Sequence, residues 1–306
     1  MSKMNITKNI KIRTDLGEVH QVISDFHHWP KWSPWLVTEP EARVHVSEDG
    51  KFYTWEGKRV GSGQMKLVKE TENRIDCTLE FIKPWKSKAK IWFDLNEKDD
   101  STEVVWHMNS SWPFFLFFMK KKMKALIGMD YERGLNMLKE YVEKGRVSST
   151  LEFPGESGYP GCQYVGIRRK TTMSHLGKDM EKDFTDLMEK VQTAGEFTGE
   201  WFSQYHKFDF VKQEVEYTAG VAVKDWKEAL PNGWTQGQIP ATRMQTVRHI
   251  GPYEHLGNAW SAAQAMIQAK EFRPNKKIHP LEFYRNDPAD VAPEDLISDV
   301  SFAIKA

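Results

Sequence analysis

Glu282 and Tyr284 are two residues of this 306-residue sequence, a carboxylate and a phenol two positions apart, whose types could do acid–base chemistry or bind a cation. They lie in residues 281–285, where the pattern is typical of a β-strand. Because side chains alternate between the two faces of a strand, Glu282 and Tyr284 point the same way, so a carboxylate and a phenol lie side by side. The alternative is that Glu282 is a solvated strand residue paired with a nearby Lys or Arg.

The rest of the sequence offers no compelling catalytic triad, metal-ligand cluster or phosphate-binding loop. Cys77 and Cys162 belong to no CxxC or Cys/His grouping, so we expect two buried thiols in a reducing compartment. The imidazoles of His27, His28 and His107 could act as acid or base, but no carboxylate stands at a telling spacing from them. We therefore expect neither a metal nor another cofactor.

The charge balance argues against a nucleic-acid partner, because 43 Lys and Arg residues are matched by 43 Asp and Glu residues. The N-terminus lacks the apolar stretch of a signal peptide, which predicts a cytoplasmic protein. The most hydrophobic run, residues 112–119, is too short to span a bilayer. We expect it to begin a helix that packs on a core, with contact to a membrane surface as the alternative and no stable insertion.

The length predicts two domains, and the first half has the pattern of an antiparallel sheet followed by a helix. A short helix is expected over residues 16–25, and the expected strands are residues 4–12, 43–46, 51–55, 63–70, 74–81, 89–96 and 103–109. Apolar residues recur every three to four positions in residues 114–144, which predicts one long helix across the sheet. A curved sheet that grips such a helix encloses a cavity that could hold a ligand.

The second half contains an internal repeat, because RRKTTMSHLG at residues 168–177 aligns with RHIGPYEHLG at residues 248–257. Each copy reads as a strand, a helix and two further strands, that is, βαββ twice. Residues 146–161 are rich in Ser, Gly and Pro and have the composition of a linker. The expected fold is therefore α+β, with a helix-grip domain in residues 1–145, a linker in 146–161 and the duplicated domain in 162–306.

The loop FHHWPKWSPWL at residues 26–36 holds three tryptophans stiffened by two prolines. With the short first helix, the strands and DYERGL in the long helix, residues 1–145 resemble the SRPBCC superfamily of START-like or polyketide cyclase-like domains. This resemblance implies a deep apolar pocket for lipids, polyketides or hydrophobic hormones, and no single reaction. The candidate lining residues, for each of which ordinary core is the alternative, are Trp32, Trp35, Trp55, Trp92 and Trp106.

In the second half, RHIGPYEHLGNAW at residues 248–260 resembles the HxGPYxxLxxAW pattern of the GyrI-like family, the effector-binding domain also found in AraC- and MerR-type regulators. The closing segments HPLEFYRNDP and PEDL are similar to the end of that family's pattern, and the resemblance spans about residues 155–306. It implies that Glu282 and Tyr284 face a pocket between the repeats, with Trp260 as a stacking wall. Tyr253 and Trp201 are further candidate ligand contacts.

Together the two resemblances favour a protein that binds small hydrophobic molecules, for sensing or sequestration, over an enzyme. A carboxylate in an aromatic cleft favours cationic ligands. Because some GyrI-like proteins hydrolyse reactive hydrophobic compounds, a hydrolase is the alternative, with Glu282 as general base and Tyr284 as proton donor. A third function is a ligand-responsive regulator of a partner protein. No DNA binding is expected, because a helix-grip domain stands where the family's regulators carry a helix-turn-helix.

Overall fold

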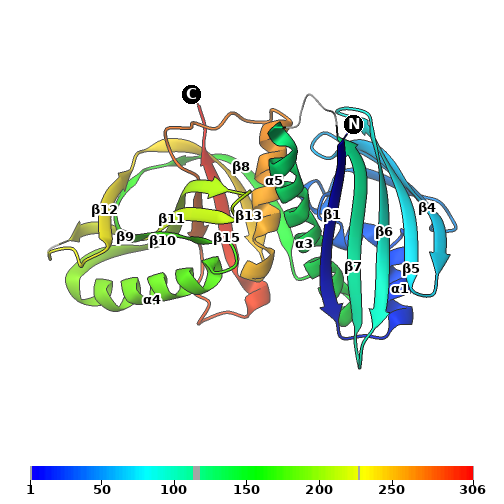
Figure 1. Cartoon of the computed structure of the whole chain (residues 1–306). Coiled ribbons are helices and arrows are strands. Elements are labelled where there is room, and N and C mark those ends of the chain that lie inside the picture. The colour runs from blue at the N-terminus through cyan, green and yellow to red at the C-terminus, as the bar shows by residue number, and fades with distance from the viewer. Residues whose placement is uncertain (1, 113–117, 227, 306) are drawn as a thin grey trace. The chain divides into compact units, whose positions relative to one another are not determined.

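The computed structural model describes residues 2–112, 118–226 and 228–305. The chain divides into two compact units, Met1–Ser148 and Ser149–Ala306, and each has its own sheet and its own helices (Figure 1). The fold is α+β, as the sequence predicts. None of the helices in this described part of the chain has both the length and the apolar character that crossing a bilayer requires.

The first unit is built on a seven-stranded antiparallel sheet with the order β1-β7-β6-β5-β4-β3-β2. Its strands are β1 (Ser2–Ile12), β2 (Arg43–Val46), β3 (Phe52–Gly57), β4 (Gly61–Thr71), β5 (Arg74–Lys83), β6 (Ser87–Glu97) and β7 (Thr102–Trp112). Each predicted strand of this half is present, because the alternation of apolar and polar residues there matches a sheet with one buried face.

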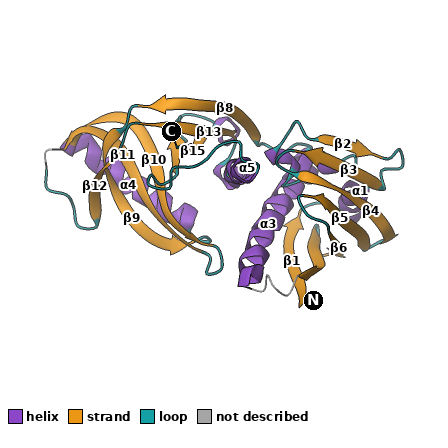
Figure 2. Cartoon of the chain, turned by 90° about the horizontal axis from the view of Figure 1, so that it is seen from above, coloured by secondary structure: helices purple, strands orange, loops and turns teal. Residues whose placement is uncertain are grey.

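Short helices and one long helix complete the first unit. They are α1 (Leu16–Ser24), α2 (Trp29–Trp32), the 3₁₀ turn η1 (Leu36–Thr38) and α3 (Lys120–Lys144). The carboxylate of Asp15 caps α1 by accepting a hydrogen bond from the Glu18 backbone N–H at 2.9 Å. Part of the predicted start of the long helix, residues 114–117, lies outside the described residues. Figure 2 shows α3 beside the sheet, and the Tyr131 ring on α3 stacks against Trp106 of β7.

The second unit is built on an eight-stranded antiparallel sheet with the order β12-β9-β11-β10-β14-β15-β13-β8. Its strands are β8 (Thr150–Tyr159), β9 (Cys162–Thr172), β10 (Gly195–Asp209), β11 (Glu214–Trp226), β12 (Trp234–Ile239), β13 (Thr242–Ile250), β14 (Leu281–Tyr284) and β15 (Ile297–Ala303). Helices α4 (Leu176–Ala194) and α5 (Gly257–Gln268) each follow the first strand of a βαββ repeat. Two short 3₁₀ turns lie within the second copy, η3 (Tyr253–His255) before α5 and η4 (Pro293–Asp295) before β15.

The prediction of a linker in residues 146–161 is wrong for most of that segment, because residues 150–159 form strand β8. This strand precedes β9 in sequence but pairs with β13, the strand that comes before the helix of the other repeat. In the same way β12 precedes β13 but pairs with β9. Each repeat is therefore ββαββ, and its first strand, β8 or β12, pairs at the edge of the sheet with a strand of the other repeat. The strand order is consequently symmetric: equivalent strands of the two repeats follow one another in the same order from either edge.

Both helices of the second unit pack on one face of its sheet. Leu187 of α4 lies in a core cluster with Tyr217 and Ala219 of β11, and Ala263 of α5 lies in one with Val300 of β15. Strand register places these sheet residues on the same face as Glu282, since Glu282 pairs with Val300. The carboxylate therefore points toward the layer that holds α4 and α5.

Candidate functional site

The carboxylate of Glu282 is a buried polar group, with only 3% of the residue exposed. Trp260 Nε1 donates a hydrogen bond to Oε1, while the hydroxyls of Tyr205 and Tyr284 donate to Oε2 at 2.7 and 2.8 Å. These three partners are neutral, so the alternative of a solvated glutamate paired with a Lys or Arg is wrong. Buried carboxylates are normally paired with a cation, and one held only by neutral donors can receive a positive charge.

Strand register brings the hydroxyl groups to the carboxylate. In the β10–β14 pair, Ser203 lies directly opposite Glu282 and Trp201 lies opposite Tyr284. Tyr205 follows two residues after Ser203 on the same face of β10. The Tyr284 hydroxyl, besides donating to Glu282, lies 3.0 Å from Ser203 Oγ. The site therefore belongs to the two central strands of the sheet, one from each repeat.

The internal repeat makes the two tyrosines equivalent. The 80-residue offset of the repeat aligns Arg169 of β9 with His249 of β13. From β9 toward the centre of the sheet, Arg169 pairs with Tyr217, which pairs with Tyr205. From β13 toward the centre, His249 pairs with Ser298, which pairs with Tyr284. Tyr205 is thus the counterpart of Tyr284. Two residues earlier, Ser203 is the counterpart of Glu282, so only the second repeat places a carboxylate at the centre of the sheet.

Burial dominates the electrostatics of this site. It raises the pKa of Glu282 above 4.5, while the hydrogen bonds from Trp260, Tyr205 and Tyr284 act in the opposite direction. Burial, together with the nearby Glu282 carboxylate, also raises the pKa of both Tyr205 and Tyr284 well above 10. The phenols consequently stay protonated and act as donors to the carboxylate.

Aromatic side chains surround the site and continue to the surface. Phe184 of α4 lies edge-on to Tyr284 and to Trp201, with ring centroids 5.3 and 6.0 Å apart. Tyr253 contacts Tyr284 at 5.7 Å and is 41% exposed, while Phe197 contacts Trp201 at 6.5 Å and is 46% exposed. Large apolar side chains left in water beside a buried carboxylate are typical of the entrance to a ligand site.

A second buried carboxylate, Asp183, holds α4 on the sheet. It accepts hydrogen bonds from the Arg169 guanidinium, with Nε at 2.8 Å, and from the Tyr217 hydroxyl at 2.8 Å. Asp183 is paired with a cation, unlike Glu282, and it raises the pKa of Arg169 above its ordinary value. This cluster fixes the helix that carries Phe184, one residue further along the chain.

In the first unit, four of the five candidate tryptophans lie on the interior side. Trp32 and Trp106 are fully buried, Trp55 is buried and Trp35 packs against the same core. The Trp106 ring stacks on Tyr131 with centroids 3.9 Å apart, and Trp32 and Trp35 meet its edge at 5.8 and 6.0 Å. These rings fill the space between the sheet and α3, so their role as ligand contacts stays a prediction.

Trp92 is the exception, and its expected place in the interior is wrong. The β6–β7 register pairs Phe93 with Trp106 and Trp92 with His107, so Trp92 lies on the opposite face of the sheet. There it stacks on His107 at 4.8 Å. His107 Nε2 also lies 3.1 Å from Asp94 Oδ2, a carboxylate partner on the adjacent strand that linear spacing does not reveal.

Four polar groups of the first interior have no hydrogen-bond partner among the described residues: Trp32 Nε1, Trp106 Nε1, Ser110 Oγ and Tyr131 Oη. Burial raises the pKa of Tyr131 well above 10, so its hydroxyl keeps the proton. A buried donor without an acceptor costs about 1–3 kcal/mol. The core of this unit therefore presents four groups that can donate a hydrogen bond to an acceptor that enters it.

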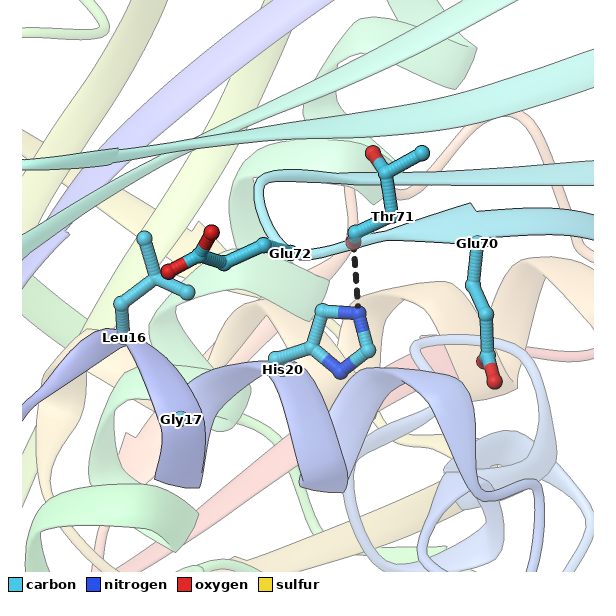
Figure 3. A pocket seen from close by; sticks show the side chains of 6 residues that line it. All are labelled: Leu16, Gly17, His20, Glu70, Thr71 and Glu72. Atoms are coloured by element: carbon cyan, nitrogen blue, oxygen red, sulfur yellow. Dashed lines mark hydrogen bonds between the residues drawn. The ribbon is translucent and has the colours of Figure 1, made fainter.

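The first unit also has a surface hollow of about 410 Å³ between the start of α1 and the β4–β5 turn. Figure 3 shows its lining: Leu16, Gly17, His20, Glu70, Thr71 and Glu72. The His20 imidazole lies with Nε2 3.0 Å from the carbonyl oxygen of Thr71. None of the sequence-predicted site residues lines this hollow.

The two cysteines are free thiols, as expected, but only Cys77 is buried, while Cys162 is partly exposed. Burial raises the pKa of the Cys77 thiol to about 12. Cys162 Sγ accepts a hydrogen bond from the Tyr159 hydroxyl at 3.1 Å. Among residues 2–112, 118–226 and 228–305, no three His, Cys, Asp or Glu side chains gather in a way that could hold a metal ion.

Comparison with known proteins defines the class of each unit. Residues 3–143 match a family described as polyketide cyclase / dehydrase and lipid transport, and residues 159–305 match the GyrI-like small molecule binding domain. The class is therefore that of small-molecule-binding proteins. More particularly, the chain joins a polyketide cyclase-like domain of the SRPBCC type to a GyrI-like domain, which confirms the architecture predicted from the sequence.

Several solved structures are similar to this chain at low identity. They include an EcmrR–DNA complex (15% identity over 63% of this chain and 78% of that chain, TM-score 0.43) and the EcmrR C-terminal domain (18%, 51% and 98%, TM-score 0.43). A START superfamily protein from Mycobacterium smegmatis is similar at 18% identity over 46% of this chain and 97% of that chain, with a TM-score of 0.33. No curated protein matches the chain.

Sequence reasoning placed Glu282, Tyr284 and Trp260 together but missed Tyr205 and Ser203. The signal for both was present, because they follow Trp201 at two-residue steps along an expected strand. What the sequence does not contain is the register that sets Ser203 opposite Glu282. The hydrogen bond from Trp260 Nε1 was also missed, since Trp260 was expected only as a stacking wall.

Proposed function

We propose that this protein is a cytoplasmic binding protein whose second unit holds small hydrophobic cations, with Glu282 as the counter-charge. The observation that supports this most directly is the burial of the Glu282 carboxylate among neutral donors. A cation beside it would gain an ion pair in a poorly solvated place, where charges interact far more strongly than in water. Such a ligand would also lower the pKa of Glu282.

The aromatic shell suits the same ligand class. Trp260, Tyr205 and Tyr284 present ring faces and edges around the carboxylate, and a desolvated cation over such a face gains about 2 kcal/mol. Tyr253 and Phe197, which are exposed, supply an apolar entrance. A lipophilic cation satisfies both requirements, since it brings charge to Glu282 and apolar surface to the rings.

The test is a thermal-shift and calorimetric titration with tetraphenylphosphonium and with the neutral, similarly shaped triphenylphosphine oxide. A ligand at about 100 times its Kd stabilises the folded state by about 2.7 kcal/mol. We expect the cation to stabilise the wild type, and Glu282→Gln to lose this effect. Glu216→Gln is the matched control, because Glu216 lies on the opposite face of β11 and pairs with Arg168. Equal responses of wild type and Glu282→Gln would contradict the proposal.

For the first unit we propose a separate site for neutral or acidic hydrophobic molecules. The support is the set of three unpartnered donors among the buried rings of Trp32, Trp106 and Tyr131. A ligand with a carbonyl or carboxylate oxygen would supply the missing acceptor. Fatty acids and polyketide-like ketones should stabilise the chain, and Trp106→Phe, which removes one donor but keeps a ring, should weaken them without changing the response to tetraphenylphosphonium.

A hydrolase is the second candidate for the second unit. The observation that favours it is the 2.8 Å contact between Tyr284 and a carboxylate whose pKa is raised, because a general base with a raised pKa abstracts a proton from water more readily. Glu282 would accept the proton of the attacking water, and Tyr284 would donate one to the leaving group. Incubation with activated hydrophobic esters and mass spectrometry tests this: product must form with wild type and not with Glu282→Gln.

A further inference from the structure

One end of the first unit collects exposed apolar side chains. Trp85 and Phe118 are each 68% exposed, and Ile82 and Met119 are exposed beside them in sequence. They make up four of the ten large apolar side chains that are exposed in the described part of the chain. Single exposed apolar residues are ordinary on a protein surface, but a gathering of them marks an interaction surface.

Strand register places these residues at the same end of the sheet. Ala89, near the start of β6, pairs with Ser110, near the end of β7, so the β5–β6 turn that holds Trp85 lies where β7 finishes. Helix α3 begins at Lys120, soon after β7, and Phe118 lies at most roughly 22 Å of extended chain beyond the end of that strand. Figure 1 shows the end of β7 and the start of α3 at the same end of the unit.

Lysines lie at the same end of the sheet as these apolar side chains. The start of β1 lies at this end too, because Lys3 pairs with Ser111. The cations contributed by β1, by the end of β5, the β5–β6 turn and the start of β6, and by the start of α3 are Lys3, Lys83, Lys86, Lys88, Lys120, Lys121, Lys122 and Lys124. Two of them are paired with carboxylates, Lys83 with Glu56 and Lys88 with Glu80, and the excess of positive charge remains large. We call this set of apolar residues and lysines the basic apolar end.

We propose that the basic apolar end docks the protein reversibly on an anionic membrane surface. Exposed apolar side chains that share one end of a sheet with lysines suit the boundary of a bilayer, where Trp and Phe enter the interface while the long lysine stems reach back to lipid phosphates. Trp in particular prefers that boundary. Charge complementarity selects anionic lipids, since each lysine near such a surface strengthens binding.

The composition of the basic apolar end favours a membrane over a nucleic acid. All eight cations of this set are Lys, whereas Arg, whose planar fork dominates recognition of phosphates and bases in nucleic acids, occurs at this end only farther from β7, as Arg43 on β2 and Arg59 in the β3–β4 turn. Ile82 and Met119 add aliphatic surface, which can enter acyl chains but has no stacking partner in a nucleic acid. This docking does not depend on the ligand proposed for Glu282, because it uses residues of the first unit alone.

The experiment is co-sedimentation of the full chain with vesicles of phosphatidylcholine alone and of phosphatidylcholine mixed with phosphatidylserine. We expect binding to the mixed vesicles only, and weaker binding as salt increases. Lys86→Ser and Lys121→Ser should each weaken binding about fivefold, in line with the contribution of one surface lysine. Trp85→Ser combined with Phe118→Ser should abolish the binding that remains at high salt.

A matched control lies at the opposite end of the same sheet. Val68 on β4 is an exposed apolar residue, and Lys98 in the β6–β7 turn is an exposed cation. Val68→Ser with Lys98→Ser should bind as the wild type does. All replaced side chains are exposed, so thermal unfolding should be unchanged in each variant and a folding defect can be recognised directly.

Three results would overturn the proposal. The first is wild type that fails to sediment with phosphatidylserine-containing vesicles at low salt. The second is unchanged sedimentation of both the lysine variants and the Trp85 and Phe118 variant. The third is lysine-dependent binding of a fluorescent single-stranded oligonucleotide without binding to vesicles, which would assign the surface to nucleic acid instead.

Discussion

At Glu282, burial and hydrogen bonding act on one carboxyl group in opposite directions. Burial favours the protonated form, whereas the three donors favour the carboxylate, and burial has the larger effect. The group is therefore held nearer to its protonated form than a solvated glutamate, without losing its hydrogen-bond partners. This balance makes its titration a direct report on the site.

The folded protein should keep the Glu282 proton to a higher pH than the unfolded chain, whose glutamate titrates near 4.5. The unfolding free energy therefore contains a contribution that is fully present below that pH and is lost as pH rises through the raised pKa. Compared with Glu282→Gln, which does not titrate, wild type should lose up to about 1.4 kcal/mol per pH unit across this window. Urea unfolding at a series of pH values measures the difference. A wild-type minus variant difference that is constant above pH 4.5 would contradict the assignment.

The two equivalent tyrosines should have similar effects on that titration. Tyr205→Phe or Tyr284→Phe removes a hydrogen bond that lowers the pKa of Glu282, so each should move its titration to higher pH. Carboxyl ¹³C chemical shifts measured against pH follow this directly. Tyr217→Phe is the control, because Tyr217 donates to Asp183 instead. A shift of Glu282 in that control, or none in either tyrosine variant, would show that the hydrogen bonds do not set the pKa.

At the level of single residues, periodicity predicted the face of the strand on which a side chain lies, but not the residues on neighbouring strands that it contacts. The two-residue alternation correctly placed Glu282 and Tyr284 on one face, because that depends only on their own strand. Trp92 was misplaced since it was grouped with Trp106 by residue type, although register sets the two on opposite faces. Tyr205 could not be linked to Glu282 without knowing that β10 and β14 are neighbours, and this depends on how the whole sheet assembles.

Among the elements, α4 should depend strongly on the Asp183 cluster. Arg169→Met leaves the fully buried Asp183 without its cation, and breaking a buried pair in this way costs about 3 kcal/mol or more. Arg168→Met, one residue away, removes a largely exposed pair with Glu216 and should cost less than about 1 kcal/mol. Chemical denaturation of both variants measures the contrast. Equal costs would mean that the Arg169 pair does not hold the helix.

Strand β8 should be required for the stability of the second unit. A chain that begins at residue 160 lacks this strand, which leaves the edge of β13 unpaired and removes Leu151 and Phe153 from the core they contact. We expect its unfolding free energy to be about 2–3 kcal/mol below that of a chain that begins at residue 149. The exposed edge should also promote self-association, which light scattering detects. Equal stability of the two chains would restore the linker interpretation.

The linker prediction failed because composition outweighed pattern. Residues 146–161 contain many Ser, Gly and Pro residues, yet Leu151 and Phe153 stand at the two-residue spacing of a strand with one buried face. Pro154 and Gly155 are tolerated because β8 is an edge strand, where a missing donor and a positive φ of 84° at Gly155 do little harm. The βαββ repeats were predicted because their helices and strands lie wholly within each copy.

For the whole molecule, no hydrophobic core cluster of the described residues contains residues from both units. All members of the first core lie before residue 149, and the four clusters of the second unit lie after residue 148. Residues 1–148 and residues 149–306, produced separately, should therefore each fold with a single cooperative transition. Urea unfolding followed by far-UV circular dichroism tests this. A unit that is unfolded by itself would show that its stability depends on the other.

In the second unit, β8 and β12 each pair with a strand of the other repeat, and this has a consequence for how such a site can arise. Two separate molecules of one ββαββ copy could form the same eight-stranded sheet as a symmetric dimer, but their central strands would then be identical in sequence. Glu282 would face a second glutamate at the position of Ser203, with Cβ atoms only about 5 Å apart, and like charges at that distance force one of them to stay protonated. Joining both copies in one polypeptide removes this symmetry constraint. Duplication within one chain thereby allows a single carboxylate, Glu282, at the centre of the sheet, with the small hydroxyl of Ser203 opposite it.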